Sequence, residues 1–235
     1  MLFLRHVQSF LTLSQFPTTM HDTATNNMLI ITDILPQRSR TQPRRVRLSD
    51  GFTFPISDDT IVRFGLAKGV VVSDEQVREI RSQEETFQAK QAALAICGRR
   101  LRSRKELEEK LREKEFSSEA IEAATTFAAE YGYLDDLNFA QAFIRDQVLR
   151  RPVGRQRLQL ELQRRGVAKQ DIAEALSSVF SDSEQELQLA IAAAKKKLAT
   201  SRITDPQKRE RSLANFLAAR GFGWEVVRKV IEELK

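Results

Sequence analysis

The fold prediction rests on residues 154–167, which read GRQRLQLELQRRGV. Leu158 and Leu162 are four residues apart, so in a helix both side chains lie on one face and can be buried together. Basic residues near the end of the stretch complement the helix dipole, and Gly166 follows where a left-handed backbone is favoured. The stretch therefore predicts a short amphipathic helix that ends at a glycine turn and leads into Val167.

The same pattern occurs three times, which indicates a tandem repeat. Equivalent positions are separated by 51 and then 55 residues, as in Leu107, Leu158 and Leu213. The other matched sets are Leu111, Leu162 and Leu217; Lys114, Arg165 and Arg220; Glu115, Gly166 and Gly221; Phe116, Val167 and Phe222; and Ile121, Ile172 and Val227. Because Glu115 takes the glycine position in the first copy, we expect a less favourable turn there.

Each copy also contains an earlier helical segment, at about residues 84–98, 136–150 and 184–200. The repeat unit is therefore three helices long. We expect an elongated array of three such units, in which each unit contacts its neighbours along the chain. The predicted units are residues 86–135, 136–182 and 183–235.

Residues 28–85 differ from the repeats and predict a small β-rich module. Short apolar segments begin at Met28, and Asp50-Gly51 separates two of them in the manner of a type I′ hairpin. Residues 1–27 have a broken apolar start followed by a stretch rich in Thr and Asn. We expect them to be a disordered tail or an over-long start, with Met28 as the true first residue. The chain is thus predicted to be mainly α-helical.

The composition indicates a folded protein in a reducing compartment. Hydrophobic residues make up 41% and charged residues 30% of the 235 positions, which excludes a membrane protein and a wholly disordered chain. Cys97 is the single cysteine, so an internal disulfide is impossible. We therefore expect a cytoplasmic, monomeric protein.

Few residues are suited to catalysis. The two histidines, His6 and His21, both precede the predicted module, which argues against histidine-based catalysis and histidine-ligated zinc. The chain has no glycine-rich phosphate loop and no paired cysteines. We predict that the protein is not an enzyme, and that it has no catalytic, metal-binding or cofactor-binding residues.

A possible exception is the segment from Tyr131 to Asp136, which ends in two adjacent carboxylates. Adjacent side chains do not converge on one point, so we interpret Asp135 or Asp136 as the N-cap of the next helix. Tyr131 and Tyr133 are then core or hinge contacts. The alternative is a metal-dependent nucleic-acid enzyme with both aspartates at its centre.

The net charge of +6 arises entirely from residues 88–235, which carry 28 basic and 22 acidic side chains. The most basic stretch lies in the second copy and is opposed only by Asp146 and Glu161. Its cations are Arg145, Arg150, Arg151, Arg155, Arg157, Arg164, Arg165 and Lys169. We favour these eight as a surface for an anionic partner over a merely solvated face. Lys195 to Lys197 are interpreted as an exposed helix end. Short leucine-rich helices with glycine turns also leave a helix-turn-helix DNA-binding protein as an alternative.

Several of these segments resemble the RecX family of recombinase regulators. The resemblance rests on the segment Gly132-Tyr133-Leu134-Asp135-Asp136 with Phe139-Ala140, on residues 104–111 before it, and on the second copy after it. It covers about residues 88–235, and residues 28–85 look like an extension found in some members. The departures are Glu115 and the extra residues 1–27.

The resemblance implies three tandem three-helix repeats and a partner, the RecA recombinase. Members of the family bind along the groove of the RecA–DNA filament and suppress its ATPase, strand-exchange and coprotease activities. The implied role is inhibition of RecA in DNA repair, DNA recombination and the SOS response, with direct contact to single- or double-stranded DNA as a further possibility. The family has no established catalytic residues.

Overall fold

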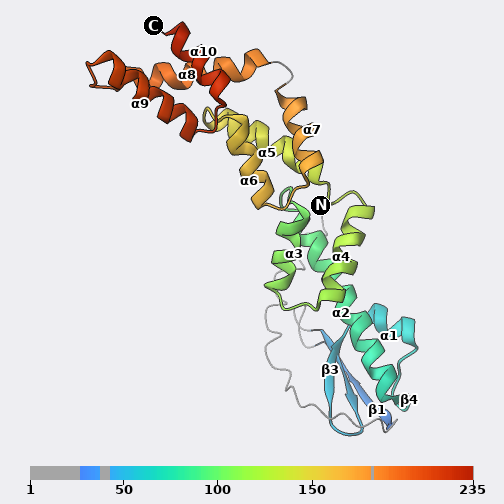
Figure 1. The fold of residues 1–235 in the computed structure, drawn as a ribbon. Helices are drawn as coiled ribbons and strands as arrows, with labels where there is room; N and C mark the ends of the chain where they lie inside the picture. The colour runs from blue at the N-terminus through green and yellow to red at the C-terminus, as the bar shows by residue number, and fades with distance from the viewer. Residues whose placement is uncertain (1–26, 38–42, 181–182, 235) are drawn as a thin grey trace. The chain divides into compact units, whose positions relative to one another are not determined.

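The computed structural model describes residues 27–37, 43–180 and 183–234, so the predicted tail lies outside it apart from Asn27. The chain divides into two compact units. The first unit ends at Leu134 but leaves out residues 101–106, which belong to the second unit with residues 135–234. Within the described residues, ten helices and one four-stranded sheet confirm a mainly α-helical fold with a small N-terminal β-module (Figure 1).

The module is an antiparallel sheet covered on one face by helices. Its strands are β1 (Met28–Leu35), β2 (Arg44–Leu48), β3 (Thr53–Ile56) and β4 (Val71–Ser73), in the order β3-β2-β1-β4. Buried and exposed residues alternate along β1 and β2, as expected of a sheet with one solvated face. Helix α1 (Asp58–Phe64) follows β3, and Val46, Phe54 and Ile56 lie in the core beneath.

The predicted hairpin joins β2 to β3, but its turn differs from the predicted type I′. Gly51 has a φ of 88°, whereas Asp50 does not have a positive φ. The Gly51 N–H donates to the Leu48 carbonyl at 3.0 Å, and the Asp50 carboxylate accepts from the Phe52 N–H at 2.8 Å. This is a three-residue loop with glycine in the left-handed position, in which the aspartate side chain holds the turn.

Helix α2 (Asp74–Cys97) connects the module to the first repeat without a break. Ser73 and Gln76 form the capping box that their spacing predicts. Val77 and Ile80, in the first turns of the helix, are buried in the core of the module. Ala89 and its neighbours in the later turns are buried in the core of the first repeat. The division predicted at residues 85/86 therefore falls inside a continuous helix.

The three predicted repeats are present as groups of helices, each with its own core. The first uses the end of α2 with α3 (Arg104–Arg112) and α4 (Ser118–Glu130). The second and third are α5 (Asp136–Arg150), α6 (Arg155–Arg164) and α7 (Lys169–Val179), then α8 (Ser183–Ala199), α9 (Pro206–Ala219) and α10 (Trp224–Glu233). All six repeated leucines of α3, α6 and α9 are buried, which confirms the pattern that defined the repeat.

The middle helix of each repeat ends in a residue with a positive φ, as predicted. Gly166 and Gly221 have φ values of 81° and 83°. Glu115 has a φ of 64° and is the one non-glycine residue with a positive φ in the part of the chain described. A side chain in this region costs free energy, because the Cβ atom crowds the following carbonyl. The first repeat therefore tolerates a strained turn.

We predict that the substitution Glu115→Gly stabilises the protein by about 1 kcal/mol. Removing the Cβ atom relieves about 1–2 kcal/mol of strain, and the greater freedom of glycine in the unfolded chain returns part of it. Glu115 is exposed, so little packing is lost. Denaturant unfolding of the two proteins measures the difference, and a destabilised variant would contradict the prediction.

The tyrosines that follow α4 do not lie in the core, which was one of the two roles predicted for them. Tyr131 and Tyr133 have exposed fractions of 66% and 51%. Gly132 between them has a φ of 72°, so the segment turns there, and Leu134 is the buried residue of the group. Tyr131 instead packs against Phe127, with ring centroids 4.6 Å apart and the ring planes tilted by 42°.

Candidate partner-binding surface

Three of the eight cations predicted to bind a partner are engaged where repeats meet. Arg155 forms an ion pair with Glu186, with Nε and Oε2 3.1 Å apart, and a second nitrogen donates to the Phe180 carbonyl at 2.8 Å. Arg165 forms an ion pair with Glu106, and its guanidinium lies 4.8 Å from the centre of the Phe143 ring. These two arginines therefore stabilise the packing of neighbouring helices.

Arg157 is the third engaged cation. Its Nε lies 2.9 Å from the Glu161 carboxylate, one turn further along α6. Its Nη1 donates to the Ala219 carbonyl at 3.5 Å, near the end of α9. The guanidinium of Arg157 is therefore directed toward the third repeat.

The remaining five cations are more available. Arg150 pairs with Asp146 one turn earlier at 2.9 Å, and Arg151 makes a long contact of 3.5 Å with Gln147. Neither pairing buries the guanidinium, since both arginines are exposed. Among the described residues, four of the eight have no ion-pair partner: Arg145, Arg151, Arg164 and Lys169. The second repeat therefore keeps an open set of cations: Arg145, Arg151, Arg164 and Lys169.

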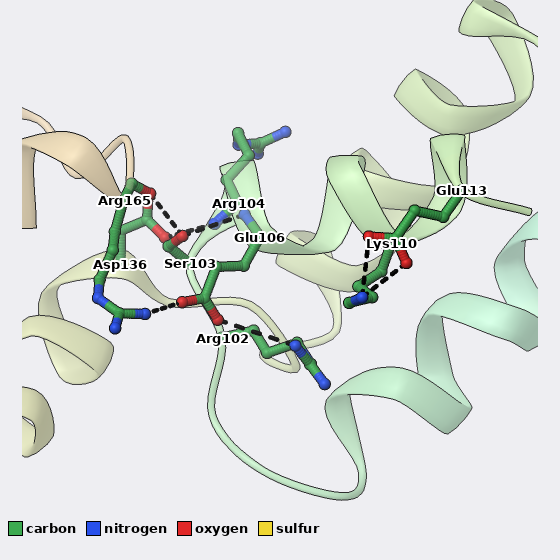
Figure 2. A network of polar contacts seen from close by, with 8 residues as sticks. All are labelled: Arg102, Ser103, Arg104, Glu106, Lys110, Glu113, Asp136 and Arg165. Carbon is green, nitrogen blue, oxygen red and sulfur yellow. Dashed lines mark hydrogen bonds and ion pairs between the residues drawn. The ribbon is translucent and has the colours of Figure 1, made fainter.

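A polar network fastens residues 101–106 to the second repeat (Figure 2). The buried Ser103 hydroxyl donates to the Arg165 carbonyl at 2.6 Å and accepts from the Glu106 N–H at 3.2 Å. The Arg104 N–H donates to an Asp136 carboxylate oxygen at 2.8 Å. The N-terminus of α3 is therefore contacted by the Asp136 carboxylate and by the turn that ends α6.

The second and third repeats meet through an equivalent junction. The Gly154 N–H donates to the Arg220 carbonyl at 2.9 Å, and the Arg155 N–H donates to the Glu186 carboxylate at 2.9 Å. Ser103 and Gly154 are 51 residues apart, as are Arg104 and Arg155, so the junction repeats with the same period as the helices. Sequence reasoning missed this junction. The repeat offsets align its backbone positions but not its two carboxylates, Asp136 and Glu186, which are 50 residues apart.

The glycines at these junctions allow backbones to approach closely. A Cβ atom on Gly221 would lie 2.4 Å from both the backbone N and the Cβ of Arg157. A Cβ atom on Gly154 would lie 2.2 Å from the Gly221 carbonyl oxygen. Gly166 is less constrained, because its nearest neighbours are side-chain atoms of Lys105. Glycine is thus required at Gly221 for both its positive φ and its contact with α6.

Asp135 and Asp136 both act as structural acceptors. The Asp135 carboxylate caps α5 by accepting from the Asn138 N–H at 2.9 Å, as predicted. Asp136 serves the start of α3 instead. Burial raises the pKa of Asp136 above its ordinary value of 3.8, and the nearby carboxylates of Asp171 and Asp135 act in the same direction. The hydrogen bond from the Arg104 N–H and the charge of Arg104 lower this pKa and offset part of the effect.

This pKa shift predicts a pH dependence of stability. The folded state holds the Asp136 proton more tightly than the unfolded state, so the free energy of unfolding falls as pH rises from 3.8 through the raised pKa. We expect Asp136→Asn to remove this decrease in the free energy of unfolding with pH. At pH 7 the same variant should change that free energy by less than about 0.5 kcal/mol, since the amide oxygen can still accept from the Arg104 N–H. Asp136→Ala loses the acceptor and should cost about 1 kcal/mol. Unfolding measured between pH 3 and 7 tests both variants, and equal losses in the two at pH 7 would contradict the assignment.

The described residues contain no group of three or more His, Cys, Asp or Glu side chains placed to hold a metal ion. None of the described helices combines the length and the apolar character needed to cross a membrane.

Comparison with known proteins identifies the three repeats. Residues 89–127, 135–176 and 184–231 match the first, second and third three-helix domains of RecX. The protein named regulatory protein RecX from Clostridium botulinum strain Eklund 17B is 29% identical over 208 residues, covering 88% of this chain and 96% of that protein. The protein of the same name from Clostridium perfringens strain SM101 is 28% identical over 204 residues, with coverage of 87% and 95%.

Two solved structures have a similar fold. A crystal structure of regulatory protein RecX superposes with a TM-score of 0.71 at 21% identity, over 87% of this chain and 99% of that one. The crystal structure of RecX from Lactobacillus salivarius gives a TM-score of 0.58 at 20% identity, over 65% of this chain and 97% of that one.

Proposed function

Because the chain belongs to the RecX family, we propose that it regulates the RecA recombinase, mainly as an inhibitor, by binding along the groove of the RecA–DNA filament. In this role it would restrain the ATPase, strand-exchange and coprotease activities of the filament. It would thereby modulate DNA repair, recombination and the SOS response in the cytoplasm.

The observation that carries this proposal is the match of all three repeats to the three RecX domains in the order of the family. The repeated junction adds physical support. The second and third repeats meet through contacts equivalent to those that fasten residues 101–106 to the second, so a similar junction recurs along the chain. A filament also presents the same surface at regular intervals, so a repeat protein suits such a partner.

Within this proposal, the contact surface lies on the second repeat. Of the eight cations predicted there, the open set of Arg145, Arg151, Arg164 and Lys169 is the part available to meet an anionic partner. Arg155, Arg157 and Arg165 contribute indirectly, because they fix the neighbouring helices on which this set is displayed.

The regulation we propose needs no chemistry of its own. Asp135 and Asp136 each accept a hydrogen bond from the backbone at the start of a helix, so both carboxylates have structural roles. The effect on RecA then follows from occupying the filament. Nucleotide hydrolysis or DNA cleavage that copurifies with the protein and is lost in Asp135→Ala would overturn this part of the proposal.

The proposal is tested with RecA assembled on single-stranded DNA. We expect increasing amounts of the protein to reduce ATP hydrolysis by the filament, and pull-down at matched salt to retain more protein on filaments than on naked DNA. An unchanged ATPase rate with no preference for filaments would reject the proposal. A base-specific footprint on naked duplex DNA would support the helix-turn-helix alternative.

A further inference from the structure

The third repeat carries a second group of cations, at the end of α8 and the start of α9. Residues 195–211 contain seven basic residues against two acidic residues, Asp205 and Glu210. Six of these cations are exposed, and we name them the α8–α9 basic surface: Lys195, Lys196, Arg202, Lys208, Arg209 and Arg211. Among the described residues, the single ion pair formed by these six is that of Lys208 with Asp205 at 3.9 Å.

Residues 200–205 join the end of α8 to the start of α9. Helix α8 ends at Ala199 and α9 begins at Pro206, and a short loop joins them at one end of the third repeat (Figure 1). The Lys197 ammonium lies 5.7 Å from the centre of the Phe216 ring, so the last turns of α8 run beside α9. The cations of both helices therefore flank the loop that joins the two helices.

The fold does not account for the cations on α9. Lys208, Arg209 and Arg211 lie in its first two turns, where positive charge opposes the helix dipole, and the first turn has no acidic residue. The N-cap Asp205 accepts from the N–H groups of Gln207 and Lys208 and is the main opposing charge. These three cations therefore lower the free energy of unfolding of the free protein. A bound anion would neutralise them and restore this stability.

The other two middle helices show what this position does elsewhere in the molecule. The starts of α3 and α6 each receive a carboxylate from the following repeat, Asp136 and Glu186. The start of α9 receives its carboxylate from its own N-cap residue, Asp205. Helix α9 is 14 residues long against 10 for α6, and this added length carries Lys208 and Arg209. The third repeat thus caps its middle helix with its own aspartate and places cations in the turns that follow.

We propose that the α8–α9 basic surface binds the phosphate backbone of nucleic acid. Six cations spread over two helix ends and their connecting loop suit a chain of regularly spaced charges, because each strand of a DNA duplex carries one phosphate about every 3.4 Å along the helix axis. This inference rests on the proposed function, since it gives a protein that acts on a DNA-bound filament its own contact with DNA.

The test is the triple variant Lys208→Gln, Arg209→Gln and Arg211→Gln, with binding to a fluorescent single-stranded oligonucleotide followed by anisotropy at several salt concentrations. Each lost phosphate contact lowers the slope of log K against log salt by about 0.7 for single strands. We expect the slope to fall by about 2, and the affinity to fall about 100-fold at 0.1 M salt, with convergence near 1 M. The melting temperature should hold or rise, because the substitutions remove charge that opposes the dipole.

A variant with the same change in net charge serves as the control: Lys68→Gln, Arg78→Gln and Arg112→Gln, all exposed and outside the surface. It should retain the wild-type slope. Equal slopes in the two variants, or no binding of the oligonucleotide by the wild type, would overturn the inference. Loss of RecA inhibition with unchanged DNA binding would assign the surface to an acidic protein partner and would also overturn it. If the wild type binds DNA through this surface but leaves the RecA ATPase unchanged, the proposed function fails while this inference stands.

Discussion

Replacing Gly221 by alanine should destabilise the third repeat by about 2–5 kcal/mol. The left-handed backbone at this position accounts for about 1–2 kcal/mol, because Gly221 has a φ of 83°. The remainder is steric. The new Cβ atom would overlap the backbone and Cβ of Arg157, and overpacking of this kind typically costs about 1–3 kcal/mol.

The loss should be local. Gly221 packs on the start of α6, and its carbonyl accepts from the Gln156 N–H at 3.1 Å. Since neighbouring repeats contribute separate stabilities and interface terms, a broken interface should release α8, α9 and α10 before the rest of the chain. Hydrogen exchange measured with mass spectrometry should therefore show faster exchange in residues 184–233 and nearly unchanged exchange in α4.

Two further glycines separate the backbone cost from the steric cost. Gly132 has a φ of 72° and open space where a Cβ would lie, so Gly132→Ala should cost only the backbone term of about 1–2 kcal/mol. A Cβ atom on Gly166 would meet the Lys105 side chain, nearest at its Cβ atom, but no backbone atom, so Gly166→Ala should fall between the other two. If Gly221→Ala costs no more than Gly132→Ala, the close junction between the second and third repeats is wrong.

Reversing the open cations of the second repeat should weaken filament binding about 30-fold or more. The variant combines Arg151→Glu, Arg164→Glu and Lys169→Glu. Breaking charged contacts at an interface typically costs about 2–5 kcal/mol, and the loss should shrink as salt rises. We exclude Arg157 from this variant, because a glutamate there would oppose Glu161 and disturb the junction.

The fold should survive these substitutions, since all three residues are exposed. A glutamate at position 169 falls in the first turn of α7, where negative charge is favourable, and this offsets the less favourable change near the end of α6. Binding to RecA filaments at two salt concentrations, after a check of thermal unfolding, measures the effect. The matched control reverses Lys68, Arg78 and Arg112. An affinity equal to that of this control would exclude the second repeat as the contact surface.

The repeat could be predicted from the sequence because its signals are local. The leucine pairs and the residue at the end of each middle helix recur at fixed spacing, and the structure confirms their burial and their positive φ values. The capping roles of Ser73 and Asp135 were predictable for the same reason, since each accepts from a residue three positions away.

The availability of individual cations was not predictable. Arg155 and Arg165 look alike in the sequence to Arg164, yet their partners, Glu186 and Glu106, lie 31 and 59 residues away. Such pairings depend on how repeats pack, which spacing within one helix does not report. The exposed Tyr131 and Tyr133 show the same limit, because an aromatic residue beside a turn fits either a core or a surface.

Glu115 also shows that the copies are not interchangeable. Gly166 and Gly221 each fit against the start of a preceding middle helix, whereas Glu115 belongs to the copy that has no such predecessor and is exposed. If the copies arose by duplication of one unit, every copy except the first would need glycine at the end of its middle helix, because that residue packs against the preceding middle helix. A protein engineer who moved the first copy behind another would need to restore glycine there before the extended chain could assemble.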